Sequence, residues 1–235
     1  MYAFEYFRPQ GQDEALAACE GDARFLAGGQ SLVQAMKLRL SASERLVDLG
    51  EVKGLDAIAC ADGVLTIGAM VRHATVARSA EVRRHLPALA ELAEGIGDPM
   101  VRSMGTLGGS LANADPAACY PAAVLALGAT VHTHDRSIPA QDFFTGLYGT
   151  ALRAGELLTA VSFPLARRAA YAKFKQPASR FALVGVMVAQ TSEGARVAVT
   201  GAKDHVFRDS VLEAALNHEF TPESARTLSL IHISE

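Results

Sequence analysis

The sequence predicts an α+β protein whose short strands and helices are joined by glycine-rich turns. Some segments of the chain have the pattern of apolar residues that is typical of buried strands, and others have the pattern typical of amphipathic helices. Two loops far apart in the sequence also share a chemistry of paired glycines and hydroxyl groups. These loops are residues 27–31 (AGGQS) and residues 105–116 (GTLGGSLANADP).

The composition is that of a globular protein without a nucleic-acid or membrane signature. The chain has 235 residues and is 50% hydrophobic, so it can bury a core and divide into more than one unit. With 22 basic and 25 acidic residues, it has no basic surface for nucleic acid. No apolar run approaches the roughly 20 residues of a membrane span, and the first residues lack a signal-peptide pattern. Three cysteines lie far apart without a Cys-x-x-Cys pair, so we expect a cytoplasmic protein.

The first glycine loop lies between a predicted strand, residues 23–27, and a predicted helix, residues 32–40. Ser31 is a good N-cap for that helix. Such an arrangement turns backbone N–H groups and the positive end of a helix dipole toward an anion. The loop therefore indicates phosphate binding, with a plain strand-to-helix turn as the alternative.

The middle of the chain is predicted to contain a hairpin and several helices. Two apolar runs flank Asp62-Gly63, a dipeptide typical of tight hairpin turns. Pro87 is expected to start a second helix within the helical region 75–97. The second glycine loop, residues 105–116, is expected to bury little. The remaining predicted elements are strands at 46–49, 129–134 and 156–164, a buried helix within 117–128 and a short helix at 139–146.

A separate α+β domain is predicted from residue 166 onward. It contains strands at 171–176, 184–190 and 196–201 and an amphipathic helix at 209–218. The last residues, 228–235 (LSLIHISE), resemble the translated reading frame of a widely used transposon sequencing adapter. We exclude them from the fold and expect the natural chain to continue beyond Thr227; an ordinary terminal strand is the alternative.

The sequence contains no recognisable acid, base or nucleophile. Motifs of P-loops, Rossmann sites, α/β-hydrolases and zinc proteases are all missing. His132 and His134 share one face of a strand, but no third metal ligand is near, so we expect a solvated edge. His73 and His85 are expected on helix surfaces. We predict no catalytic residue and no metal site; phosphate-binding loops without such groups fit a cofactor that carries the chemistry.

Several segments resemble the FAD-binding medium subunit of molybdenum hydroxylases, the family of xanthine dehydrogenase and aerobic carbon monoxide dehydrogenase. The match runs from Met1 to about Ala225. The matching segments are residues 25–32 (FLAGGQSL), 102–116 (RSMGTLGGSLANADP), 142–146 (DFFTG), 171–182 (YAKFKQPASRFA) and 199–202 (VTGA).

The resemblance implies a two-part FAD-binding region of the vanillyl-alcohol-oxidase (PCMH) type, followed by a C-terminal α+β domain. The expected FAD-binding subdomains are residues 1–55 and 56–165. Residues 166–227 are expected to form the C-terminal domain, in incomplete form.

The resemblance also implies which residues hold FAD. The first loop is expected to wrap the pyrophosphate with main-chain donors, and the second to grip the phosphates and ribityl chain from the other side. The expected binding residues are Ala27, Gly28, Gly29, Gln30, Ser31, Leu32, Val33, Thr106, Gly108, Gly109, Ser110, Asn113, Asp115 and Cys119.

One of these residues departs from the family pattern. Cys119 stands where the family often has Asp, and a thiol accepts hydrogen bonds weakly. Losing a charge-assisted hydrogen bond costs roughly 1.5–3 kcal/mol, enough to loosen FAD without abolishing binding. Since the first loop has no His or Cys for covalent flavin attachment, dissociable FAD is expected.

The resemblance implies an electron-transfer subunit. It would take electrons from a 2Fe-2S small subunit and pass them to an acceptor, while a molybdopterin-containing large subunit oxidises the substrate, in a dimer of heterotrimers. The chain shows no cluster or molybdopterin ligands and is not expected to turn over substrate alone. Two alternatives stay open, a stand-alone flavin oxidoreductase of the same fold and a non-catalytic nucleotide-binding module.

Overall fold

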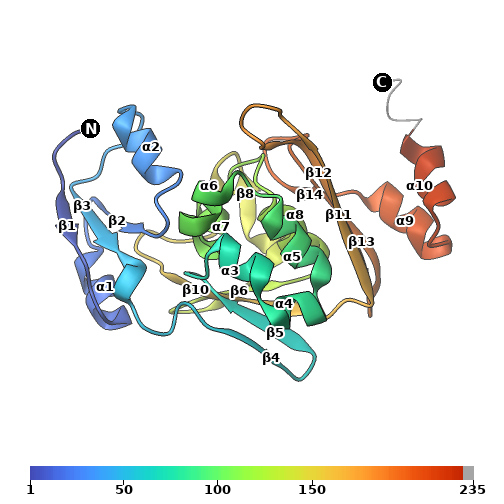
Figure 1. The fold of residues 1–235 in the computed structure, drawn as a ribbon, viewed down its shortest axis with the longest axis horizontal. Helices are drawn as coiled ribbons and strands as arrows, with labels where there is room; N and C mark the ends of the chain where they lie inside the picture. Colours follow the sequence, from blue (N-terminus) through green and yellow to red (C-terminus); the bar gives the residue numbers. More distant parts are fainter. Residues whose placement is uncertain (230–235) are drawn as a thin grey trace.

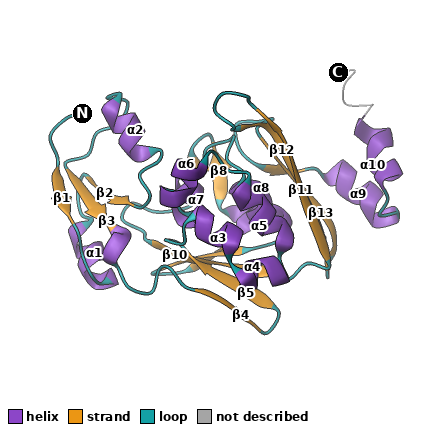
Figure 2. Cartoon of the chain, in the orientation of Figure 1, coloured by secondary structure: helices purple, strands orange, loops and turns teal. Residues whose placement is uncertain are grey.

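The computed structural model describes residues 1–229. Within them, three larger β-sheets follow one another along the chain, together with a two-stranded ribbon (Figures 1 and 2). None of the helices in this range has the length and apolar character that a bilayer crossing requires.

The N-terminal sheet is small and parallel. Its strand order is β1-β3-β2, and the intervening helices supply the crossovers that parallel neighbours require. Val47, Leu49 and Leu55 form its core together with Leu157 from a distant part of the chain. The elements are β1 (Glu5–Phe7), α1 (Gln12–Ala18), β2 (Ala23–Leu26), α2 (Leu32–Lys37), β3 (Arg45–Asp48) and a 3₁₀ helix (Leu49–Glu51).

The central sheet is antiparallel, with strand order β4-β5-β10-β6-β7. Its first hairpin turns at Asp62 and Gly63, whose φ angles of 51° and 76° are those of a type I′ turn, as predicted. The strands are β4 (Ile58–Ala61), β5 (Val64–Gly68), β6 (Thr130–Thr133), β7 (Ser137–Pro139) and β10 (Leu158–Pro164).

Six helices lie between the second and third strands of this sheet in sequence. Pro87 is the first residue of α5, as predicted, and two shorter helices separated at Ser79 precede it. The helices are α3 (His73–Arg78), α4 (Ala80–His85), α5 (Pro87–Glu94), α6 (Pro99–Met104), α7 (Leu107–Asn113) and α8 (Tyr120–Ala126).

The C-terminal sheet is antiparallel, with strand order β11-β12-β13-β14. Helices α5 and α8 contact this sheet, and Figure 1 shows them between it and the central sheet. One core therefore joins both sheets, with Met187 and Ala198 buried beside Leu89 and Val124. The elements are β11 (Arg168–Lys175), β12 (Ala182–Thr191), β13 (Gly194–Thr200), β14 (Phe207–Arg208), α9 (Ser210–His218) and α10 (Pro222–Ser229).

The structure corrects two predicted elements. Residues 105–116 are not a loop with little to bury, because α7 occupies most of them and fully buries Leu107 and Leu111, one helical turn apart. Residues 139–146 do not form the single short helix that was predicted. They make a 3₁₀ helix (Ala140–Asp142) and then β8 (Phe144–Gly146), which pairs with β9 (Gly149–Thr150). Gly146 has a φ of 153°, which an α-helix cannot contain.

The segment attributed to an adapter lies largely outside the described residues. Only Leu228 and Ser229 of residues 228–235 are described, at the end of α10.

Candidate cofactor site

A cavity of about 400 Å³ lies where the N-terminal sheet, helices α6 and α7 and the β11–β12 connection meet. Every predicted FAD-binding residue except Val33 lines it. The two glycine segments, more than seventy positions apart in the sequence, thus share one cavity, as the resemblance implies.

Val33 faces Gly29 instead of the cavity. Its N–H donates to the Gly29 carbonyl at 3.2 Å, and its Cγ2 would lie 3.0 Å from a Cβ placed on Gly29. Gly29 has a φ of 68°, a left-handed conformation that glycine adopts without strain. Val33 therefore supports the shape of the loop from behind.

The backbone N–H groups of residues 28–31 have no acceptor among the described residues. Helix α2 starts at Leu32 as predicted, but the Ser31 side chain accepts no capping hydrogen bond. Residues 28–30 are half-buried and Ser31 is exposed, and this row of N–H groups without a protein acceptor at a cavity wall can serve an acceptor-rich ligand.

Two glycines allow the two segments to touch. A Cβ placed on Gly28 would lie 2.1 Å from the Met104 carbonyl oxygen, and one on Gly109 would lie 3.3 Å from the Cβ of Ala27. A larger side chain at either position would push the loops apart. The glycines therefore set the width of the cavity between the loops.

Several main-chain donors of the second segment are used within the protein. Thr106 caps α7 by accepting the Gly109 N–H at 3.1 Å, and the Gly108 N–H donates to the Ala69 carbonyl at 2.8 Å. The Ser110 N–H closes the first helical turn onto the Thr106 carbonyl. The Gly108 N–H thus ties α7 to the residue that follows β5, while the Gly109 and Ser110 N–H groups stabilise the first turn of α7.

Two polar side chains at this wall have no partner among the described residues. The Ser110 hydroxyl and the Asn113 amide both line the cavity and make no hydrogen bond there. Asp115 uses one carboxylate oxygen to accept the Ala117 N–H at 2.8 Å, which stabilises the turn leading to Cys119. The Ser110 hydroxyl and the Asn113 amide are therefore available to a ligand in the cavity.

His73 corrects a sequence-based expectation. It is 5% exposed, lines the cavity at the start of α3, and its ring packs on Tyr120 with centroids 5.3 Å apart. Burial, with a smaller effect of the Arg102 charge, lowers the pKa of His73 to about 4, so the ring is neutral at pH 7. Its spacing from Val76 and Ala77 on one helical face was the signal for burial.

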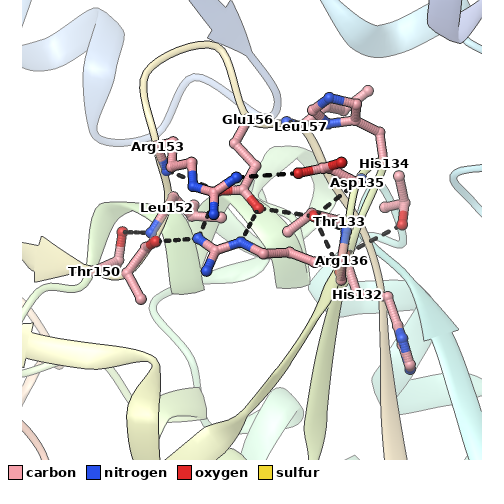
Figure 3. A network of polar contacts seen from close by, with 12 residues as sticks. His132, Thr133, His134, Asp135, Arg136, Thr150, Leu152, Arg153, Glu156 and Leu157 are labelled. Atoms are coloured by element: carbon pink, nitrogen blue, oxygen red, sulfur yellow. Dashed lines mark hydrogen bonds and ion pairs between the residues drawn. The ribbon is translucent and has the colours of Figure 1, made fainter.

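Glu156 is a cavity residue that the sequence did not identify. Its carboxylate accepts two hydrogen bonds from Arg136, at 2.8 and 2.9 Å, and one each from the Thr133 hydroxyl and the Arg153 N–H (Figure 3). The Arg136 hydrogen bond is the main cause that lowers the pKa of Glu156 to about 2. This ion pair, in which the carboxylate is buried and the guanidinium is partly exposed, holds the chain segment that brings Leu152 and Leu157 to the cavity.

Lys173 is a second cavity residue that the sequence analysis left unassigned, although it lies in a segment that carries the resemblance. Its ammonium donates to the carbonyls of Gly95 at 2.6 Å and Arg180 at 3.0 Å. Cys119, which is buried, lies 3.5 Å away through its Sγ. The contact joins residues 54 positions apart, so no local pattern could have revealed it.

His132 in β6 and His134 directly after it already have protein partners, and His132 does not lie on the predicted solvated edge because β6 pairs with both β10 and β7. The ring nitrogens of His132 hydrogen-bond to Ser137 and Ser162, and Nδ1 of His134 accepts the Leu157 N–H. In residues 1–229, no three His, Cys, Asp or Glu side chains are grouped as a metal site would require. His85 is half-exposed and lies 3.4 Å from Glu81 one turn earlier in α4.

The cavity suits a phosphate-bearing cofactor. The unpaired N–H groups of residues 28–31 match phosphate oxygens, which are strong acceptors. The two loops approach each other closely at Gly28, so the cavity wall at this point consists of backbone atoms. The Ser110 hydroxyl and the Asn113 amide add donors for the hydroxyl-rich part of a dinucleotide.

Comparison with known proteins agrees with this chemistry. The family described as FAD binding domain in molybdopterin dehydrogenase matches residues 2–166. The chain is 35% identical to the nicotine 6-hydroxylase medium subunit of Paenarthrobacter nicotinovorans, with 97% of this chain and 85% of that protein aligned.

Two solved structures share the fold. One is carbon monoxide dehydrogenase from Hydrogenophaga pseudoflava, with a TM-score of 0.89, 35% identity and coverage of 95% of this chain and 83% of that chain. The other is quinoline 2-oxidoreductase from Pseudomonas putida 86, with a TM-score of 0.87, 32% identity and coverage of 92% and 80%. The chain therefore belongs to the family of FAD-binding domains of molybdopterin dehydrogenases and is an FAD-binding subunit of an oxidoreductase of that type.

Proposed function

We propose that FAD binds in the cavity with its pyrophosphate against the free backbone N–H groups of residues 28–31. This row of donors is the observation that carries the proposal. Ser110 and Asn113 face the same space from the second segment and are assigned to the phosphates and the ribityl hydroxyls. Thr106, Gly108 and Gly109 act by shaping α7, because the Thr106 hydroxyl and carbonyl and the Gly108 and Gly109 N–H groups are used within the protein.

Bound FAD supplies the electron-accepting chemistry that no side chain of the chain provides. The protein's residues bind and orient it. Gly28 and Gly109 keep the two segments close, while the Arg136–Glu156 pair holds the wall that carries Leu152 and Leu157. His73 lies next to Gly105, and because its ring is neutral at pH 7 it adds no charge to the cavity wall.

The chain transfers electrons within a complex. We assign it a molybdopterin-containing large subunit and a 2Fe-2S small subunit as partners, in a dimer of heterotrimers. The relatives support this, since they carry names such as medium subunit and medium chain. The substrate is oxidised in the large subunit, and this chain passes the electrons onward to an acceptor.

We also propose a division into FAD-binding subdomains of residues 1–55 and 56–165 and a C-terminal domain of residues 166–227. In support, each of the three larger sheets lies within one of these segments. The C-terminal domain shares a core with the second subdomain, so we expect these two to unfold together.

A cytoplasmic location is proposed from the three free cysteines, Cys19, Cys60 and Cys119, which suit a reducing compartment. Fractionation of the source cells tests it. Recovery of the complex with periplasmic or extracellular proteins would contradict the assignment.

Purification of the complex tests the function. We expect a flavin absorption spectrum that bleaches with reductant, two co-purifying subunits with molybdopterin and a 2Fe-2S cluster, and FAD released by acid precipitation. A protein that binds nucleotide without reductive bleaching would favour the non-catalytic module. An active monomer would favour the stand-alone oxidoreductase.

A further inference from the structure

The turn formed by residues 115–119 is attached to the C-terminal sheet by main-chain hydrogen bonds. All of its residues except Pro116 line the cavity. The Gly201 N–H, directly after β13, donates to the Pro116 carbonyl at 2.8 Å. The Ala182 N–H, at the start of β12, donates to the Ala117 carbonyl at 3.3 Å. A wall of the cavity is therefore held by strands that follow it by a long stretch of sequence.

Thr200, the last residue of β13, adds a side-chain hydrogen bond to this attachment. Its hydroxyl donates to the carbonyls of Pro116 and Ala118, the latter at 2.8 Å. A hydroxyl has one proton, so the two carbonyls share it. Thr200 has no exposed surface, and water cannot replace the hydroxyl there without a rearrangement. One side chain of the C-terminal sheet thus joins two carbonyls of the turn.

The strand opposite Thr200 fixes the direction of this hydroxyl. Thr200 is paired with Gly185 of β12, and a Cβ placed on Gly185 would lie 2.8 Å from the Thr200 methyl carbon. The methyl group therefore occupies the space that a side chain at position 185 would need. Since a threonine side chain has few favourable rotamers, the methyl contact with Gly185 leaves the hydroxyl directed at the turn.

We propose that Thr200 is a positioning residue whose hydroxyl holds the 115–119 turn in the conformation that binds FAD. The inference rests on the proposed function. A turn that is already ordered before FAD arrives loses little conformational freedom on binding, and this increases affinity. Because the coupling between two equilibria is reciprocal, bound FAD should in turn stabilise the attachment of the turn to β12 and β13.

Equilibrium dialysis of FAD against the purified complex, after its bound FAD has been removed, tests this inference. Thr200→Val keeps the size of the side chain without the hydroxyl, and we expect FAD to bind about tenfold more weakly. Thr200→Ser keeps the hydroxyl and is expected to retain most of the affinity. Thr191→Val is the matched control, because the Thr191 hydroxyl donates to the Gly194 carbonyl at the opposite end of β13, outside the cavity.

The comparison of these variants separates positioning of the turn from general stabilisation of the sheet. Unchanged FAD affinity in Thr200→Val overturns the inference, and so does an equal loss of affinity in Thr200→Val and Thr191→Val. A loss in Thr200→Ser as large as that in Thr200→Val also overturns it. A complex of the unchanged protein that does not bind FAD overturns the proposed function itself.

Hydrogen exchange of the unchanged complex tests the same coupling if Thr200→Val fails to fold. The N–H groups of Ala182 and Gly201 donate to the turn and are expected to exchange more slowly when FAD is bound. The Ala195 N–H donates to the Asn217 side chain near the opposite end of β13 and is expected to exchange equally in both states. Exchange of Ala182 and Gly201 that does not respond to FAD, or that slows no more than exchange of Ala195, overturns the inference.

Discussion

The α-carbon of Gly28 lies so close to Met104 that a methyl group on Gly28 would be 2.1 Å from the Met104 carbonyl oxygen. Gly28 belongs to the first glycine segment, after β2, and Met104 ends α6 directly before the second segment. Backbone is the obstacle on the Met104 side, so no rotamer change can relieve a clash there. The short distance between Gly28 and Met104 therefore determines whether both segments can contact the same ligand.

Gly28→Ala is expected to separate the two segments. Overpacking of this kind costs about 1–3 kcal/mol of stability, and FAD affinity should fall because the donors of residues 28–31 move away from α7. Urea unfolding and titration with FAD measure the two effects. Gly11→Ala is the control, since a Cβ placed there has no atom within 4 Å. Equal behaviour of the two variants would show that the close approach is not maintained in solution.

His73 is expected to make the protein less stable as the pH falls from 6.5 to 4. The folded protein lowers the pKa of this buried ring from 6.5 to about 4, so the unfolded chain binds a proton first. The loss is complete near pH 4 and amounts to about 3 kcal/mol, at about 1.4 kcal/mol for each pH unit. Above pH 6.5 both states are neutral and the effect vanishes.

Urea unfolding at several pH values checks this prediction. His73→Phe keeps a ring against Tyr120 and should remove the contribution of His73 to the pH dependence between 6.5 and 4. His85→Gln, at a half-exposed histidine of α4, should leave it in place. Parallel pH profiles of His73→Phe and the unchanged protein would contradict the buried neutral ring.

Arg136→Met is expected to destabilise the protein at pH 7 clearly more than Arg153→Met does, because it leaves the buried Glu156 carboxylate without its cation. Arg153→Met is the matched control. That side chain pairs with Asp135 at the surface, where such a pair contributes at most about 1 kcal/mol. Thermal unfolding distinguishes the two variants. Equal losses of stability would mean that the Arg136–Glu156 ion pair contributes no more than the surface pair of Arg153.

The Arg136–Glu156 ion pair is also expected to make the stability of the protein depend on pH in the acidic range. Hydrogen bonds, first from Arg136, lower the pKa of Glu156 from 4.5 to about 2 in the folded protein. The stabilisation is therefore fully present above pH 4.5 and is lost as the pH falls toward 2. Glu156→Gln should be less stable at pH 7 and should approach the unchanged protein at low pH. A stability difference that stays constant with pH would argue against an ionised Glu156.

Cys119→Asp is expected to tighten FAD binding about tenfold, since a carboxylate accepts hydrogen bonds from the cofactor more strongly than a thiol does. Equilibrium dialysis of FAD against the complex measures the change. Cys119→Ser keeps the size without the charge, and Cys60→Ser alters a cysteine of β4 outside the cavity. If Cys119→Asp binds FAD no better than Cys119→Ser, the thiol is not what limits affinity.

Local features of the sequence were sufficient for many of the elements. Asp62-Gly63 predicted the first hairpin and Pro87 the start of α5, because turn and helix-start preferences depend on neighbouring residues. The second glycine segment was misread as a loop. Its glycines suggested a flexible loop, but the segment forms a helix because that conformation buries Leu107 and Leu111 in the core.

The sequence by itself determined the order of the elements, the two glycine motifs and, through them, the family and its cofactor. Only the tertiary structure decided which groups of those motifs are free to bind. The Gly108 N–H meets Ala69, the Gly28 N–H meets no partner in residues 1–229, and Lys173 meets Cys119. Each outcome depends on how the three sheets pack. The local sequence around two residues that are far apart in the chain does not reveal how close they lie in the folded protein.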